Sequence, residues 1–306
     1  MKINKKAFSL IELSIVILII GILVAGVTQS SRLVSRMRIL AARSITQSSP
    51  VPSVKDIYSW HEAVSESSFD EAEASDGTSI TNWYDLNPQV SSSKIDVRQN
   101  TLAQKPTYTQ NSINGLPSLY FDGNDFFTSL IPAPAIAGGG SATAFAVFNS
   151  KDVTAQRYLI FQLQSNCANN VEIGEVAGAV QSGSYGIHTG CGYSTNSPSG
   201  TIVNNQPYVM SLVMLPSPLT SGSAANIQVY KNGVSQATNV NGGGYNTALG
   251  GSYAKSNSTL YLGSRNTDAF FFGNIGEIII YSRSLNAEER NAIEKYLGKK
   301  WGIAVQ

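Results

Sequence analysis

A single carboxylate stands in an otherwise apolar stretch near the start of the chain. The run from Phe8 to Val27, FSLIELSIVILIIGILVAGV, contains no proline and one charged residue, Glu12. An ionised carboxylate inside a bilayer costs about 2.5–3.5 kcal/mol at worst. We therefore expect Glu12 to pair with a positively charged group, and ion pairing is the chemistry that this position offers.

Carboxylates further along the chain do not form the pair that glycoside hydrolysis requires. Retaining glycosidases hold two carboxyl groups about 5–5.5 Å apart, as nucleophile and acid. Glu172 and Glu175 are three residues apart, which places them on opposite faces of a strand, and Glu277 begins an apolar strand alone. His61 and His188 have no partner motif, and the chain lacks a GxSxG nucleophile elbow. We expect no catalytic residues and no enzyme activity.

Two aspartates in the segment FDGNDFF are candidates for a metal site. Asp122 and Asp125 are hard oxygen ligands in a loop, which suits Ca²⁺. Two carboxylates are few for this ion, so backbone carbonyls and Glu277 would have to complete the site. The alternative is an Asp-Gly turn in which the side chains bond the backbone. The sequence predicts no cofactor firmly, and Ca²⁺ at Asp122 and Asp125 is the one candidate.

The two cysteines and the net charge exclude several classes of site. Cys167 and Cys191 are too few for a metal cluster of the CxxC type. In an exported domain such a pair favours a disulfide, and its loop of about 24 residues would stabilise the fold by roughly 3 kcal/mol. The alternative is two buried thiols. The net charge of +1 falls to −2 if Lys2, Lys5 and Lys6 are removed with the first seven residues. The charge indicates no nucleic-acid partner.

A long N-terminal helix must position Glu12. The apolar run matches the ~20 residues of a transmembrane helix, and the lysines before it predict a cytoplasmic N-terminus. In residues 28–45 apolar side chains recur at helical spacing, so we expect the helix to continue to about Ile45. We interpret the arginines there as a solvated face of the helix. The alternative is that they contact lipid headgroups or an acidic neighbour. Pro50 and Pro52 end the helix in a short linker.

The head that follows, residues 54–306, reads as an antiparallel β-sandwich, or jelly roll. Short alternating runs are separated by turn pairs such as Asn114-Gly115 and Asn232-Gly233. A short amphipathic helix capped by Asn286 closes the chain. Its inward residues should be Ile293, Tyr296, Leu297 and Trp301. The predicted strands are Ser118–Phe121, Ala142–Phe148, Tyr158–Gln164, Tyr208–Met214, Ile227–Lys231, Thr259–Leu262 and Ile275–Tyr281.

The N-terminal residues KKAFSLIELSIVILIIGILVAG resemble the class III signal of type IV prepilins and pseudopilins. The resemblance implies cleavage between Ala7 and Phe8 by prepilin peptidase and N-methylation of Phe8. It also implies that Glu12 neutralises the terminal amine of a neighbouring subunit during assembly. Ala7 stands where glycine is more usual in the family. The chain then divides into a leader (1–7), a transmembrane and pilin-type helix (8–49) and the head (54–306).

Segments along the head resemble the concanavalin A-like, laminin-G-like jelly-roll superfamily. They are residues 80–87, 105–108, 113–127, 142–148, 227–233, 260–266 and 271–303. The resemblance implies sugar binding, which needs an exposed aromatic ring beside amide or carboxylate groups. The candidate rings lie in loops rich in glycine and asparagine, whereas Phe270–Phe272 favours the core. The candidate ligand-binding residues are Tyr185, Tyr193, Tyr245, Asp122, Asp125 and Glu277.

Together these interpretations predict a minor pilin or pseudopilin, a filament subunit whose head serves adhesion or carbohydrate binding. One alternative is a structural pseudopilin of a secretion or DNA-uptake system without a ligand, and a weaker one is a membrane-anchored polysaccharide-active enzyme. The expected partners are prepilin peptidase, other pilin subunits through the N-terminal helix, and surface glycans. The expected location is the inner membrane, as a single-pass protein, and then an extracellular or periplasmic filament.

Overall fold

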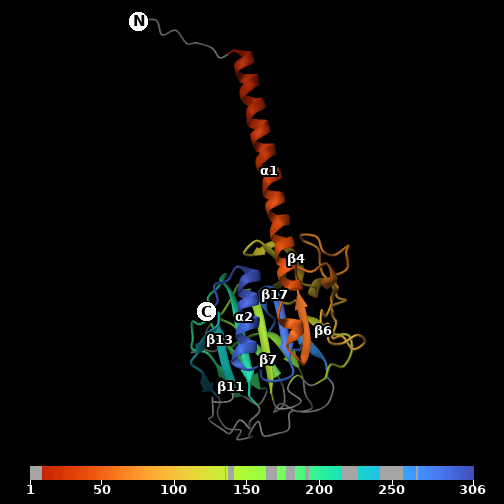
Figure 1. Ribbon diagram of the computed structural model, residues 1–306, viewed down its shortest axis with the longest axis vertical. Coiled ribbons are helices and arrows are strands. Elements are labelled where there is room, and N and C mark those ends of the chain that lie inside the picture. Colours follow the sequence, from red (N-terminus) through yellow and green to blue (C-terminus); the bar gives the residue numbers. More distant parts are fainter. Residues whose placement is uncertain are drawn as a thin grey trace.

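The computed structural model describes residues 9–134, 136, 141–162, 171–176, 183–189, 193–215, 227–241, 258–266 and 268–306. Within them a long helix, α1 (Leu10–Gln47), rises from a β-sandwich head (Figure 1). The head contains two antiparallel sheets and a second helix, α2 (Ala287–Trp301), which contacts α1. The predicted fold class, an N-terminal helix plus an antiparallel β-sandwich with a short C-terminal helix, is confirmed.

Helix α1 has a defined cap at each end. The Ser9 hydroxyl accepts a hydrogen bond from the Ile11 backbone N–H (3.3 Å), and the Glu12 carboxylate accepts one from the Ser9 N–H (2.9 Å). This reciprocal arrangement is a capping box, which satisfies free N–H groups of the first turn. The helix ends at Gln47, shortly before Pro50, which lacks the N–H that would continue the ladder. The end lies two residues beyond the predicted one.

The first sheet has the strand order β14-β13-β12-β7-β17-β5-β4. Strand β17 is central, because β7 pairs along one edge while β5 and β1 share the other. The strands of this sheet are β1 (Ile57–Glu62), β4 (Thr107–Ile113), β5 (Leu116–Asp122), β7 (Ala142–Ser150), β12 (Pro207–Met214), β13 (Ile227–Lys231), β14 (Val234–Gln236) and β17 (Phe272–Tyr281).

The second sheet has the order β15-β11-β10-β9-β8-β16-β6-β3-β2. Its strands are β2 (Asn82–Trp83), β3 (Val97–Arg98), β6 (Phe127–Ser129), β8 (Arg157–Gln162), β9 (Val171–Val176), β10 (Ser184–Thr189), β11 (Tyr193–Asn196), β15 (Asn239–Asn241) and β16 (Leu260–Leu262). Short 3₁₀ helices occur at Val51–Ser53, Glu66–Ser68 and Leu102–Gln104. The seven predicted strands coincide with observed ones to within a few residues.

Two of the predicted turns have the backbone geometry that their sequences require. Asn114 and Gly115 have φ values of 50° and 82°, and Asn232 and Gly233 have values of 51° and 82°. A positive φ at both central residues is the mark of the type I′ turn, which joins tightly paired antiparallel strands. These turns connect β4 to β5 and β13 to β14.

The head has two hydrophobic cores. The larger one, between the two sheets, includes Trp83, Phe121, Phe127 and Phe148. The second lies against the other face of the first sheet and contains residues of β1, β7, β17, α1 and α2, among them Trp60, Phe145, Tyr281, Ala42 and Trp301. Because Ala42 is buried in this second core, the last turns of α1 belong to the head.

Helix α2 matches its sequence prediction closely. The Asn286 side chain accepts a hydrogen bond from the Glu289 N–H (2.9 Å), and the Glu289 carboxylate accepts one from the Asn286 N–H (3.1 Å). Gly302 ends the helix at a φ of +64°, a conformation that favours glycine. All four residues predicted to face inward are buried: Ile293, Tyr296, Leu297 and Trp301.

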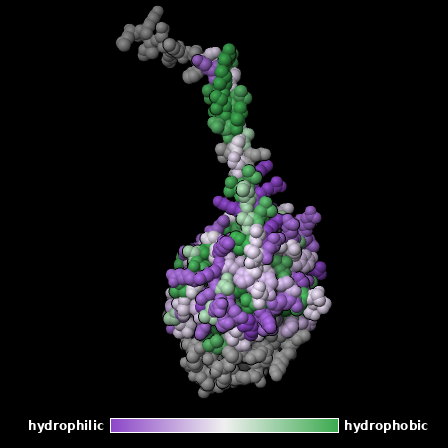
Figure 2. Space-filling view, viewed as in Figure 1, coloured by the Kyte–Doolittle hydropathy of each residue, from purple (hydrophilic) through white to green (hydrophobic). Residues whose placement is uncertain are grey.

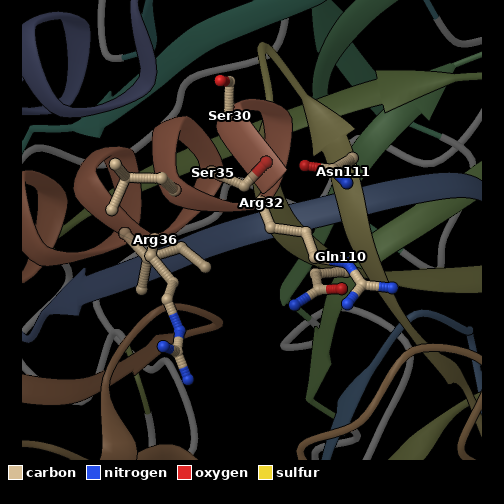
Figure 3. A pocket seen from close by; sticks show the side chains of 8 residues that line it. Ser30, Arg32, Ser35, Arg36, Gln110 and Asn111 are labelled. Carbon is tan, nitrogen blue, oxygen red and sulfur yellow. The ribbon is translucent and has the colours of Figure 1, made fainter. Parts of the chain in front are cut away.

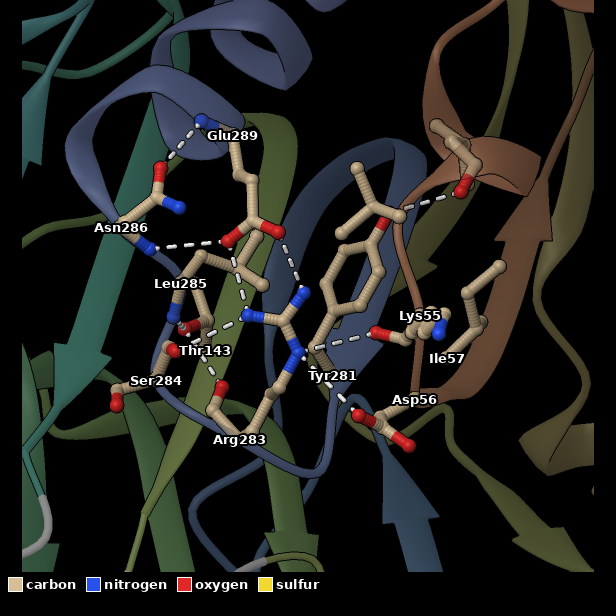
Figure 4. A network of polar contacts seen from close by, with 12 residues as sticks. Lys55, Asp56, Ile57, Thr143, Tyr281, Arg283, Ser284, Leu285, Asn286 and Glu289 are labelled. Atoms are coloured by element: carbon tan, nitrogen blue, oxygen red, sulfur yellow. Dashed lines mark hydrogen bonds and ion pairs between the residues drawn. The ribbon is translucent and has the colours of Figure 1, made fainter.

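Arg283 joins the beginning of the head to the beginning of α2 (Figure 4). Its guanidinium donates two hydrogen bonds to Glu289 (2.9 and 2.7 Å) and one to the Lys55 carbonyl (3.3 Å), and it lies 3.3 Å from an Asp56 carboxylate oxygen. These contacts lower the pKa of Glu289, chiefly through the hydrogen bond from Arg283. The segment before β1 is thus tied to α2.

A buried ion cluster also connects α2 to the first sheet. The Lys300 ammonium on α2 donates to Glu62 at the end of β1 (2.7 Å) and to Glu277 in the middle of β17 (2.8 Å), and these three side chains have no exposed surface. Glu277 also accepts hydrogen bonds from Trp60, Tyr296 and Trp301, each at 2.8 Å. Burial alone would lower the pKa of Lys300, but Glu277 and Glu62 raise it above its usual range. We call Lys300, Glu62 and Glu277 the ion cluster.

We expect Lys300→Met to destabilise the head strongly. The substitution keeps the apolar stem but leaves Glu62 and Glu277 as buried carboxylates without a cation. Breaking a buried pair in this way costs about 3–5 kcal/mol. Urea unfolding of the detergent-solubilised chain, followed by tryptophan fluorescence, measures the loss.

Lys299→Met is the matched control, because Lys299 is the adjacent residue and is exposed. Its free energy of unfolding should change by no more than about 0.5 kcal/mol. Equal losses in the two variants would show that the ion cluster does not hold α2 in place.

Candidate functional site

The N-terminal half of α1 presents apolar side chains in every direction. Ile15 to Ile20 are exposed at consecutive positions, which at 3.6 residues per turn go round the whole helix. Figure 2 shows a hydrophobic column standing clear of the head. A helix that is apolar all round needs apolar surroundings. We call the exposed residues the apolar column: Leu10, Ile11, Leu13, Ile15, Val16, Ile17, Leu18, Ile19, Ile20, Ile22, Leu23 and Val24.

Below the apolar column, α1 has two different faces. Leu33, Val34, Met37 and Leu40 are exposed. On the other face Ala42 is buried, and Ile39 and Ile45 pack against the second core. The predicted apolar stripe of residues 28–45 is therefore divided between the head and the surroundings. The exposed part of this stripe continues the apolar surface of α1 beyond the apolar column.

In the part of the chain that the structure describes, no helix is both long and apolar enough to qualify as membrane-spanning.

Glu12 is an acidic residue that lies between Ile11 and Leu13 of the apolar column. It lies in the first turn of α1, where its carboxylate caps the Ser9 N–H, and it is exposed. A negative charge at a helix N-terminus is favourable because it faces the positive end of the helix dipole. Ala7 and Phe8 lie outside the described residues, so cleavage between them stays a prediction. So does the pairing of Glu12 with an amine.

Asp122 and Asp125 form a turn rather than an open ligand set. Asp125 accepts a hydrogen bond from the Asp122 N–H (2.8 Å), and Asp122 accepts one from the Asn124 N–H (3.0 Å). Glu277 does not join them, because both of its oxygens accept hydrogen bonds within the ion cluster and its surroundings. Over the described ranges, no group of three or more His, Cys, Asp or Glu residues is placed to hold a metal ion.

Asp125 is nonetheless electrostatically unusual. Its side chain is almost fully buried, with 3% of the residue exposed. Burial raises the pKa of Asp125 from 3.8 to about 7, assisted by the Asp122 carboxylate and opposed by the Asp122 N–H bond. The folded protein therefore binds a proton at Asp125 more tightly than the unfolded chain does.

The predicted sugar-binding tyrosines are not gathered into one site. Tyr185 in β10 is fully buried and stacks on Phe148 with ring centroids 5.8 Å apart, so it presents no face to solvent. Its place in the inner core differs from the predicted exposed loop. Tyr193 begins β11, but its side chain is not among those described. Tyr245, Cys167 and Cys191 lie outside the described residues, and predictions about them are unchanged.

Sequence reasoning missed an aromatic cluster on the outer face of the second sheet. In β16, Leu260 and Leu262 point into the inner core, so Tyr261 between them points outward. Tyr261 is partly exposed, and its ring centroid lies 5.6 Å from that of Phe161 and 6.3 Å from that of Phe126. Phe270 adjoins Phe126 at 5.8 Å. The alternation Leu-Tyr-Leu was the signal that could have identified Tyr261.

A polar group adjoins this face of the second sheet. Arg265 forms an ion pair with Asp268 (2.9 Å) and lies 3.9 Å from the buried carboxylate of Glu172. Its guanidinium also lies 5.7 Å from the Tyr158 ring centroid. Phe126, Phe161 and Tyr158 are buried, so Tyr261 and Phe270 are the rings of this region that are partly exposed.

Comparison with known proteins identifies the N-terminus. Residues 2–28 match the prokaryotic N-terminal methylation motif, so the chain carries a prepilin-type N-terminus, as predicted. No curated protein matches the chain.

Among solved structures, Trypanosoma rangeli sialidase with sialic acid aligns with 81% of this chain and 34% of its own, at 14% identity and a TM-score of 0.49. Domain 4 of AbnA, an extracellular GH43 arabinanase from Geobacillus stearothermophilus, in complex with arabinotriose, aligns with 79% of this chain and 98% of its own, at 13% identity and a TM-score of 0.46. A GH54 α-L-arabinofuranosidase soaked with a cyclic sulfate inhibitor aligns with 80% of this chain, and the alignment covers 63% of the arabinofuranosidase. The identity is 9% and the TM-score is 0.49. The chain spans about a third of the sialidase. At these identities and TM-scores the likenesses assign no activity to it.

We expect Asp125→Asn to change how stability depends on pH. Because the folded-state pKa is raised, the proton at Asp125 stabilises the fold below pH 3.8, and this contribution is lost as the pH rises through about 7. Asparagine resembles the protonated carboxyl, so the variant should become the more stable protein as pH rises. The difference should reach on the order of 2 kcal/mol by pH 8.

Thermal unfolding at pH 4, 6 and 8 measures this difference. Glu288→Gln, a change at an exposed carboxylate in α2, is the control and should follow the wild-type pH dependence. Parallel profiles for Asp125→Asn and the wild type would contradict a raised pKa at Asp125.

Proposed function

We propose that this chain is a type IV pilin-like filament subunit, most specifically a minor pilin or pseudopilin. The observation that carries the proposal is the methylation motif at residues 2–28, which overlaps the N-terminal half of a helix whose apolar side chains are exposed. The motif supplies the processing signal. The apolar column supplies a surface that has to be covered by lipid before assembly and by other copies afterwards.

The proposed steps of membrane insertion, cleavage and assembly follow from the charges of the N-terminus. Lys2, Lys5 and Lys6 hold the N-terminus in the cytoplasm while α1 is anchored in the inner membrane. Prepilin peptidase then cuts after Ala7, which removes those lysines and frees the amine of Phe8. Without the lysines the helix is free to leave the bilayer and enter an extracellular or periplasmic filament.

Glu12 gives the filament its register in this proposal. Its carboxylate is the negative charge of the apolar column, and in a filament core it is surrounded by apolar side chains. A buried carboxylate is tolerated only when it is paired. The Phe8 amine of a neighbouring copy is a cation at a similar depth, because Phe8 is only four residues from Glu12 in the sequence. One pairing distance then sets the axial offset between copies.

The size of the head supports a minor or tip subunit. About 250 residues surround the base of a single helix, and such bulk limits how closely copies pack around a helical core. A head of this kind presents a large outer surface for each copy.

We expect Glu12→Gln to block assembly without blocking processing. Both the wild type and the variant should begin at Phe8 and carry one added methyl group, because the cleavage site is intact. Only the wild type should form filaments, since glutamine offers no charge to the neighbouring amine. Mass spectrometry of the N-terminal peptide and electron microscopy of sheared cell-surface material provide the two measurements.

Each result bears on a different part of the proposal. A wild-type protein that still begins at Met1 would remove the processing step and with it the pilin-like function. Filaments of Glu12→Gln in normal number would leave processing in place and remove the role of Glu12. Ser14→Ala is the control, because Ser14 lies in the same stretch of α1 and carries no charge.

The finer part of the proposal is that the head binds glycans as a lectin-like, concanavalin A-like module and has no enzyme activity. It is supported by the resembling sequence segments and by Tyr261 and Phe270, which are partly exposed and pack on the buried ring of Phe126. The adjacent carboxylates Glu62 and Glu277 both pair with Lys300 and have no exposed surface, which is unlike an acid and nucleophile pair open to a substrate. The competing functions are a spacer without a ligand and a polysaccharide-active enzyme.

We expect Tyr261→Ala to weaken glycan binding by about tenfold or more, because truncating an aromatic contact removes over 1 kcal/mol at a binding hot spot. A glycan array probed with the full chain in detergent identifies a ligand, and titration measures the change. Tyr230→Ala, on the first sheet, is the control and should bind normally. The absence of any glycan bound by the wild type would favour the spacer, and released sugars would favour the enzyme.

A further inference from the structure

Positive charge gathers on the lower part of α1. From Leu13 to Val54 the sequence holds four arginines and no lysine or acid. Arg43 is engaged by the head, because it donates to the Val64 carbonyl (2.9 Å) and pairs with Glu66. The other three are exposed, and within the described part of the chain they form no ion pair. We call Arg32, Arg36 and Arg38 the basic stem.

A cavity of about 700 Å³ opens between the basic stem and the middle of β4. Arg32, Ser35 and Arg36 line it from α1, and Gln110 and Asn111 line it from β4. In Figure 3 the Arg32 side chain extends past Asn111 toward Gln110, whereas Arg36 points away from them. The lining has two guanidinium groups, amides and hydroxyls but no carboxylate, so it suits anionic side chains, which arginine binds through charge-assisted hydrogen bonds.

Negative charge gathers in the head next to the same helix. From Asp56 to Ser93 the sequence holds eight acids and no lysine or arginine. Five of them fall in residues 66–76, which we call the acidic segment: Glu66, Asp70, Glu71, Glu73 and Asp76. The pair between Glu66 and Arg43 and the bond from the Gln110 N–H to Asp76 (2.8 Å) hold the acidic segment beside α1.

Most of the acidic segment forms no ion pair with the residues that the structure describes. Among the described residues Glu66 is its ion-paired member. Asp70 bonds Asn82 and Tyr84, and Glu73 bonds Thr81, all of which are neutral. Glu71 is exposed. One copy therefore presents a basic surface and an acidic surface at the same end of the head, and most of their charges form no ion pair within the described residues.

We infer that the acidic segment of one copy docks on the basic stem of the next copy. The inference rests on the proposed function, since it requires parallel copies, and it adds the contact that fixes the height of one head against its neighbour. The two surfaces are different and complementary, which makes the contact heterologous, and heterologous contacts extend without closing when the rotation permits. An anionic bilayer is the weaker occupant, because it would attract the basic stem but repel the acidic segment beside it.

Charge reversal and its rescue test the contact in the full chain. The stem variant carries Arg32→Glu and Arg36→Glu, the segment variant carries Asp70→Lys and Glu71→Lys, and the combined variant carries all four changes. Each single-surface variant should lower the fraction of chain sedimenting as filament by about tenfold, because like charges then face each other. The combined variant should return to within about twofold of wild type, because the opposite charges again face each other.

A matched control separates this contact from bulk charge. Lys295→Glu with Lys299→Glu makes the same change in net charge on exposed positions of α2 and should assemble normally. Normal assembly of the stem variant, a combined variant as poor as the stem variant, or an equal loss in the control would each overturn the inference.

Two further outcomes identify other causes. Vesicles containing phosphatidylglycerol provide the probe for lipid. If the stem variant loses binding to them and is not rescued by the segment changes, the arginines face lipid and the docking contact is wrong. If the wild type itself forms no filaments, the proposed function fails, and the inference fails with it. Wild-type filaments that tolerate charge reversal overturn the inference alone.

Discussion

The buried ion cluster is the contact on which the arrangement of the head depends. Lys300, Glu62 and Glu277 come from the last helix, the first strand and the last strand, and they meet where water does not reach. Buried ion pairs add little net stability over apolar packing, but each partner left alone is costly. The cluster therefore favours one arrangement of these three elements over others. The base of α1 packs on the same core, so this cluster also helps to set where α1 leaves the head.

Helix α1 meets three environments along one unbroken element. Its N-terminal half is apolar all round, its middle carries the basic stem and an exposed apolar stripe, and its last turns are packed in the head. A single helix of 38 residues is about 57 Å long, so these regions are well separated along its axis. Continuity of the helix makes them rigidly related, and the position of the head follows from the position of the apolar column.

Local sequence signals predicted the elements that depend on local chemistry. The alternating runs became β5, β7, β12, β13 and β17, the Asn-Gly pairs became type I′ turns, and Asn286 with Glu289 became the cap of α2. The two-residue strands β2 and β3 carry no such signal, because they exist only where neighbouring strands provide hydrogen-bonding partners. The prepilin-type N-terminus was predictable because its residues are contiguous.

The sites of the head were less predictable, because their residues are distant in sequence. Lys300 and Glu62 are 238 residues apart, so no spacing rule joins them, and Glu277 looked isolated until β1, β17 and α2 came together. Tyr185 stands among small residues that resemble a loop, yet it lies in β10 and faces the inner core. Its neighbours are compatible with either face of a strand, so burial was decided by the register of the sheet.

The direct connection of α1 to β1 has a mechanical consequence. Strand β1 follows α1 after a short linker and pairs with β17 from Ile57 to Glu62. In Figure 1 the strands of the first sheet run lengthwise below α1. Hydrogen bonds between antiparallel strands lie across the strand direction. Tension between the head and the filament would therefore load the β1–β17 ladder in shear, so its bonds must rupture together rather than one after another.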